Sequence, residues 1–159
     1  MARAKFFLKL DITAMNDGDI CCTGRQIASL INTLDKSLNW YAADINVNST
    51  TKLLDKYTLR RPTLIGSCSE AVNIINNIDQ LLSGILLGVP NDIKKPSWNN
   101  RSFFTEDDQY QELGDALVEI RAFDTSCLEI YTSTTKIVDI ITENYPLVEK
   151  EAASKETAT

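Results

Sequence analysis

Residues 118–145 constrain the fold more than any other stretch, because two strand patterns there run directly into a helix pattern. Apolar and polar residues alternate over residues 118–123 and again over residues 127–132. A period of two is typical of strands that bury one face. Apolar residues at helical spacing then follow, and Pro146 ends that pattern. The stretch therefore predicts a strand, a second strand and a helix.

The two strands are predicted to pair as a hairpin with a three-residue turn at 124–126. In this register Ile120 lies opposite Ile130, and Arg121 lies opposite Glu129. One face is then aliphatic, and a slip of one residue would move the charges onto it. The other face, which we call the polar hairpin face, carries Glu119, Arg121, Glu129 and Tyr131.

The rest of the chain adds further strands and two helices with recognisable starts. Alternating residues 6–12, the aromatic and aliphatic run 40–47 and the apolar run 84–89 each favour a strand. Thr23 with Gln26, and Ser67 with Glu70, form two capping boxes in front of helical periodicity. We therefore expect an α+β fold: a single mixed, largely antiparallel sheet with about three main helices packed on it. Residues 1–146 form one domain, and residues 147–159 form a frayed C-terminal tail.

Two segments between these elements are less regular. Residues 91–104 show no periodicity, and loops of this length are often functional. Residues 105–114 begin with a cap and an acidic first turn and end at a glycine, which predicts a short helix.

Composition narrows the function classes. The chain has no histidine and a net charge of −6, with a balance of +3 over residues 1–61 and −9 over residues 62–159. The lack of imidazole removes the usual general base and metal ligand, and the acidic balance argues against binding nucleic acid. Without an apolar leader or a run long enough to span a bilayer, we expect a cytoplasmic protein with four reduced cysteines and no membrane contact.

The densest group of like charges is the candidate partner-binding site. Uninterrupted carboxylates with aromatic neighbours can steer and then hold a cationic protein. The alternative is a solvated acidic helix whose aromatic residues belong to the core. The predicted contact residues are Trp98, Glu106, Asp107, Asp108, Tyr110 and Glu112.

Other candidate sites have weaker patterns. The polar hairpin face is either a recognition surface, used for instance in homo-oligomerisation, or a simple cross-strand ion pair between Arg121 and Glu129. Asp107, Asp108 and Asp115 lack the spacing of a calcium loop, and Cys68 has no histidine to activate it. We therefore predict no catalytic residue, no metal site and no cofactor.

Three pieces of sequence carry a resemblance to a family: EIRAFDTS (119–126), LEIYTS (128–133) and IDQLLSGILLGV (78–89). Together they resemble the small bacterial immunity proteins of polymorphic toxins, including those of contact-dependent growth inhibition. The resemblance implies an antitoxin that binds a cognate protein toxin and occludes it without catalysis, and the acidic balance suits a basic, nuclease-like toxin. The alternatives are a regulatory or structural subunit that acts through homo-oligomerisation, and a carboxylate-dependent hydrolase.

Overall fold

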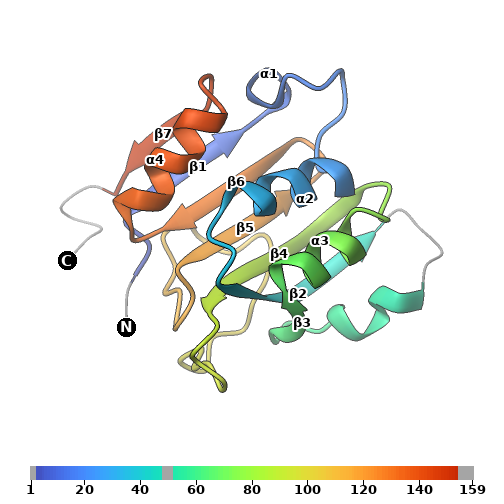
Figure 1. The fold of residues 1–159 in the computed structure, drawn as a ribbon, viewed down its shortest axis with the longest axis vertical. Coiled ribbons are helices and arrows are strands. Elements are labelled where there is room, and N and C mark those ends of the chain that lie inside the picture. The colour runs from blue at the N-terminus through green and yellow to red at the C-terminus, as the bar shows by residue number, and fades with distance from the viewer. Residues whose placement is uncertain (1–2, 48–51, 154–159) are drawn as a thin grey trace.

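One seven-stranded sheet organises the molecule (Figure 1). The structure is a computed structural model, and it describes residues 3–47 and 52–153. All six pairs of neighbouring strands are antiparallel, so the α+β class is confirmed, and the sheet contains no parallel pair in the described residues. In sheet order the strands are β3 (Thr63–Ser67), β2 (Leu38–Val47), β4 (Leu81–Pro90), β5 (Val118–Phe123), β6 (Cys127–Thr132), β1 (Phe6–Leu10) and β7 (Glu149–Ala152).

The predicted hairpin of β5 and β6 lies in the middle of this sheet. Its register is confirmed, with Ile120 opposite Ile130 and Arg121 opposite Glu129. The three-residue turn is also confirmed, and Asp124 (φ 48°) starts it in the left-handed region that aspartate tolerates. Because β5 also pairs with β4 and β6 with β1, the hairpin joins the two halves of the sheet.

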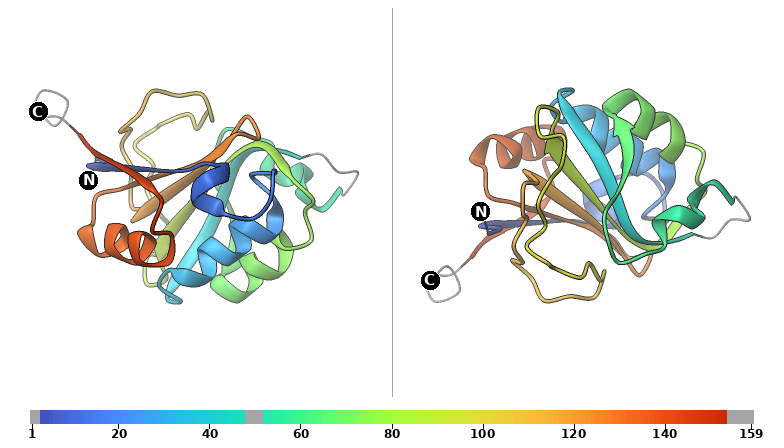
Figure 2. Two further views of the ribbon diagram at one scale, coloured as in Figure 1. Left: turned by 90° about the horizontal axis from the view of Figure 1, so that it is seen from above. Right: turned by 90° about the horizontal axis from the view of Figure 1, so that it is seen from below.

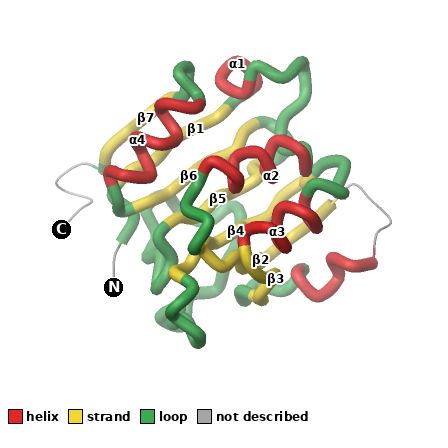
Figure 3. Tube along the Cα trace, viewed as in Figure 1, coloured by secondary structure: helices red, strands yellow, loops and turns green. Residues whose placement is uncertain are grey.

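Three main helices cover one face of the sheet, as predicted (Figures 1 and 3). They are α2 (Gly24–Thr33), α3 (Cys68–Ile75) and α4 (Thr135–Asn144); a single short turn, α1 (Ile12–Met15), follows β1. Both predicted capping boxes form, at the starts of α2 and α3. Between helices and sheet lies the larger core, which includes Leu30, Ile120 and Ile130, none more than 1% exposed.

The opposite face of the sheet is covered by residues 91–117, which we call the covering segment (Figure 2). A second apolar cluster lies beneath it, formed by sheet residues such as Phe7 and Tyr131 together with Phe103 and Leu113 of the segment. The segment follows an irregular path of turns, with one isolated bridge between Glu112 and Arg3.

The short helix predicted over residues 105–114 does not form. A helix there needs the carbonyls of Asp107 and Asp108 as acceptors for amides four residues on. Both carbonyls instead accept hydrogen bonds from the Arg121 guanidinium. Tyr110 has a positive φ of 59°, which is incompatible with a helix interior. A buried cation therefore overrides the local helix signal.

The remaining segments are short. The polar region before Pro62 contains a 3₁₀ helix, η1 (Lys52–Tyr57). Within the segment predicted to be frayed, β7 (Glu149–Ala152) pairs with β1, and residues 154–159 lie outside the described residues. In the part of the chain that the structure describes, no helix has the length and apolar character needed to cross a bilayer.

Candidate functional site

A carboxylate held between two guanidinium groups lies beneath the covering segment. Glu119 on β5 receives two hydrogen bonds from Arg101, at 2.6 Å and 3.0 Å, and one from Nε of Arg121 at 2.6 Å. The three side chains, which we call the buried triad, are 1%, 7% and 1% exposed. Two cations and one anion leave a net positive charge inside the protein. The remaining N–H groups of the two guanidinium groups therefore need further hydrogen-bond acceptors.

The covering segment supplies those partners. Arg121 donates from Nη1 to the carbonyl of Asp107 at 2.8 Å and from Nη2 to that of Asp108 at 3.3 Å. Arg101 donates from Nη1 to the carbonyl of Glu112 at 2.9 Å. Each guanidinium also stacks on an aromatic ring at about 4 Å, Arg101 on Phe103 and Arg121 on Tyr131. The triad therefore fixes the backbone that carries the predicted acidic site.

A second anchor holds the middle of the segment. The carboxylate of Asp44 on β2 accepts hydrogen bonds from both the amide and the hydroxyl of Thr105, each at 2.9 Å. The amide of Phe103 donates to the carbonyl of Arg60 at 2.9 Å. The segment is thus fixed to β5 at one point and to the region before β3 at another.

The polar hairpin face differs from its prediction. Arg121 and Glu129 are neighbours across the strands, but the ion pair of Arg121 is with Glu119, two residues along its own strand. The Glu129 carboxylate instead accepts a hydrogen bond from the Tyr131 hydroxyl at 3.2 Å, and burial raises the pKa of Glu129. The side chains of Glu119, Arg121 and Tyr131 are buried and that of Glu129 is half-buried, so most of the polar hairpin face belongs to the interior.

The four predicted carboxylates all belong to the covering segment, and three of them are exposed. Glu106, Asp108 and Glu112 are exposed, whereas Asp107 is half-buried and accepts a hydrogen bond from the Phe104 amide. Among residues 3–47 and 52–153, no Lys or Arg side chain forms an ion pair with any of the four. We call Glu106, Asp107, Asp108 and Glu112 the acidic strip.

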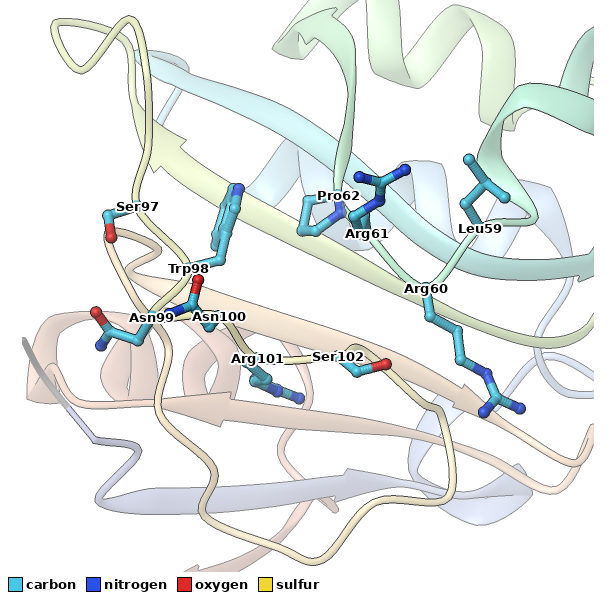
Figure 4. Close-up of a pocket in the computed structure, with 10 residues that line it drawn as sticks. All are labelled: Leu59, Arg60, Arg61, Pro62, Ser97, Trp98, Asn99, Asn100, Arg101 and Ser102. Atoms are coloured by element: carbon cyan, nitrogen blue, oxygen red, sulfur yellow. The ribbon is translucent and has the colours of Figure 1, made fainter.

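The two predicted aromatic contacts separate. The Tyr110 side chain is buried, packs edge-on against Tyr131 and leaves its hydroxyl without a described partner. Trp98 is half-buried and packs edge-on against Tyr41 and Phe103. Trp98 lines a cleft (Figure 4). Its neighbour Asn99 donates a side-chain hydrogen bond to Glu112, one of the four residues of the acidic strip.

Sequence reasoning missed Arg101 and assigned Arg121 to Glu129 instead of Glu119. Arg101 is the one basic residue between Lys95 and Arg121, and it is flanked by asparagines and phenylalanines. An isolated arginine between Trp98 and Phe103 is the signal that could have indicated a buried guanidinium stacked on an aromatic ring. Its carboxylate partner is 18 positions away, on a strand whose cover could not be identified from periodicity.

The described residues were also compared with the requirements of a metal site and of a reactive cysteine. Within the described residues, no three His, Cys, Asp or Glu side chains gather as metal ligands. All four cysteines are free and buried, and burial raises the pKa of the Cys22 thiol to about 12, which disfavours the reactive thiolate.

Comparisons with protein-family models, with curated proteins and with solved structures return no match to this chain. The geometry of the acidic strip and of its buried support therefore carries the functional argument.

Replacing the central carboxylate should destabilise the protein strongly. Glu119→Gln leaves two buried guanidinium groups without their counter-ion, and breaking a buried pair in this way costs about 3–5 kcal/mol. Chemical denaturation at pH 7 measures the loss in free energy of unfolding. The control is Glu143→Gln on the exposed side of α4, which should change stability by less than about 0.5 kcal/mol. A loss for Glu119→Gln no larger than that of the control would contradict a structural role for the triad.

The same carboxylate should give the protein a defined acid sensitivity. Burial opposes the ionisation of Glu119, but the hydrogen bond from Arg101 and the charges of Arg121 and Arg101 outweigh it, so its pKa is lowered from 4.5. A lowered pKa in the folded state contributes stability above the unfolded pKa and loses it as pH falls. The stability difference between wild type and Glu119→Gln should thus be constant at neutral pH and narrow below about pH 4.5. Denaturation curves at a series of pH values test this, and a difference independent of pH would refute it.

Proposed function

We propose that this chain is an immunity protein that binds a cognate basic toxin and neutralises it by occlusion, without catalysis. The observation that carries the proposal is the acidic strip, whose charges are unpaired among the described residues. Its backbone is fixed from below by Arg101 and Arg121. A fixed anionic surface is suited to a partner whose active-site region is positively charged, as in an enzyme that cleaves nucleic acid.

Preorganisation is the physical reason why such a strip would bind tightly. An irregular loop that becomes ordered on binding loses affinity to conformational entropy, whereas one that is already held does not. Here Thr105 is fixed by Asp44, and the carbonyls of Asp107, Asp108 and Glu112 are fixed by buried arginines. Exposed carboxylates on that backbone would accelerate encounter with a cationic toxin.

Trp98 supports the same side of the molecule as the contact surface. Tryptophan and arginine are enriched among residues that dominate binding energy, particularly where they lie in well-packed pockets. Trp98 is half-buried, and the side-chain Nδ2 of its neighbour Asn99 donates to the Glu112 carboxylate at 2.9 Å. The strip and the aromatic residue thus adjoin one another. We place the encounter in the cytoplasm, where a delivered nuclease would reach its substrate.

The two alternatives gain less support from the geometry. Homo-oligomerisation through the polar hairpin face requires residues that the covering segment buries. A carboxylate-dependent hydrolase requires acids that converge in a pocket, yet the cleft of about 820 Å³ that Trp98 lines is formed by arginine, asparagine, serine and apolar residues rather than by the strip.

Charge reversal on the strip tests the proposal. The double variant Glu106→Lys/Asp108→Lys changes two exposed side chains that make no described hydrogen bond, so the fold should survive. The affinity for the toxin domain encoded in the adjacent reading frame is measured by calorimetry at low and at physiological salt. We expect at least about tenfold weaker binding and a flatter salt dependence than for wild type, because rim charges act mainly through long-range attraction.

The matched control is Asp139→Lys/Glu143→Lys on α4, which makes the same change in net charge on the helical face. Its affinity should stay within about threefold of wild type, because charges beyond a Debye length of the interface are screened. Equal losses for the two double variants would show that net charge, and not the strip, determines binding. A failure of the wild-type protein to bind the toxin or to protect cells from it would contradict the proposed function itself.

A further inference from the structure

A cleft of about 820 Å³ separates two stretches of chain beside the acidic strip. Leu59, Arg60, Arg61 and Pro62 form one wall, and residues 97–102 of the covering segment form the other (Figure 4). Its volume falls within the range of small-molecule sites in proteins, about 300–1,000 Å³. The proposed toxin contact includes Trp98 but assigns no role to the arginines of this cleft.

The two walls are fixed relative to one another. The Phe103 amide donates to the Arg60 carbonyl at 2.9 Å, and the Arg60 guanidinium lies 4.0 Å from the centre of the Phe104 ring. Trp98 is held by edge-on contacts with Tyr41 and Phe103, at centroid distances of 5.5 Å and 5.7 Å. The cleft is therefore formed before any ligand arrives, so a ligand need not order its walls.

The cleft has a cationic lining on a protein of net negative charge. The exposed Arg61 side chain has no ion pair within the described residues, and Arg60 has one, a long contact of 3.7 Å with Asp44 that leaves it 55% exposed. Arg101 also lines the cleft, and its buried Nε–H has no described acceptor. No carboxylate is among the lining residues. The nearby Glu112 and Asp115 accept hydrogen bonds from the Asn99 side chain and the Ser97 amide.

The remaining lining residues favour a flat ring. The Trp98 indole and the Pro62 ring flank the opening from opposite walls, as Figure 4 shows. Aromatic surfaces of this kind stack on planar groups, while arginine binds phosphate and carboxylate oxygens with directional hydrogen bonds. Asn100, which also lines the cleft, adds a side-chain amide suited to the polar edge of a heterocycle.

From these features we infer that the cleft binds a small oxyanion carried on a flat ring, of about the size of a nucleoside monophosphate. The ring lies against Trp98, and the anionic group binds the guanidinium of Arg61, which lies on the same side as the indole in Figure 4. The Arg60 side chain points the other way, onto the Phe104 ring. A nucleic-acid strand is a poorer occupant, because its many phosphates would meet the adjacent acidic strip. This inference is independent of the proposed toxin-binding function.

Nuclear magnetic resonance of ¹⁵N-labelled protein provides a local test. The chain contains two tryptophans, of which Trp98 lines the cleft and Trp40 is fully buried elsewhere, so the indole signal of Trp40 serves as an internal reference. The probes are adenosine monophosphate, indole-3-acetate, adenosine alone and inorganic phosphate alone, each at up to millimolar concentration. We expect one or both ring-bearing anions to shift the Trp98 signal in a saturable way and to leave Trp40 unmoved. Adenosine or phosphate alone should bind at least about tenfold more weakly.

Substitutions connect that signal to Arg61. Arg61→Gln should weaken the affinity for the bound probe by about tenfold. Arg60→Gln, whose guanidinium lies on Phe104, and Lys94→Gln, an exposed cation outside the cleft, should each leave the affinity within about threefold of wild type. Preference for the phosphate or the carboxylate probe identifies the anion. The inference is overturned if neither ring-bearing anion moves Trp98, if adenosine or phosphate alone binds as tightly, or if Arg61→Gln binds like wild type.

Discussion

The carboxylate of Glu119 is the interaction on which one whole side of this protein depends. It lies in the middle of the sheet and is almost fully buried, where it forms ion pairs with two arginines. Without a counter-ion, the desolvation cost of burying these two positive charges would be several kcal/mol for each. The charge that remains is directed at backbone carbonyls of the covering segment. The ion pairs and the fixation of the segment therefore depend on one another. Without the carboxylate, burial of the arginines would be strongly unfavourable. Without the arginines, the carbonyls of Asp107, Asp108 and Glu112 would lose these hydrogen bonds.

The two faces of the sheet are stabilised by different physics. On the helical face, amphipathic helices bury aliphatic side chains, and their capping boxes satisfy the first amides. On the other face a smaller, largely aromatic cluster surrounds buried charges, and the cover has no regular structure. Hydrophobic contact alone specifies the conformation of such a cover poorly. Directional hydrogen bonds from guanidinium groups and from Asp44 specify it well, which suits a surface that presents charges in a fixed pattern.

How much the sequence predicts depends on the distance between the interacting residues. The hairpin register, its turn, three helices and both capping boxes follow from patterns within a few residues, and all of them form. The helix expected over residues 105–114 fails because Arg121, which lies beyond the segment, takes two of its carbonyls. Trp98 and Tyr110 are near in sequence, but only the fold shows that one lines a cleft and the other is interior. The cleft itself joins residues near 60 to residues near 100, and no periodicity links them.

The central claim is that the covering segment is a fixed platform, held to the sheet by the buried triad and by the second anchor at Asp44 and Arg60. Hydrogen exchange of its amides tests this most directly in the wild-type protein. The Phe103 and Thr105 amides have internal acceptors, so they should exchange nearly as slowly as amides in the central strand β5. Exchange of these amides at the rate of a solvated loop, while β5 remains protected, would show that the segment opens freely and would contradict the account.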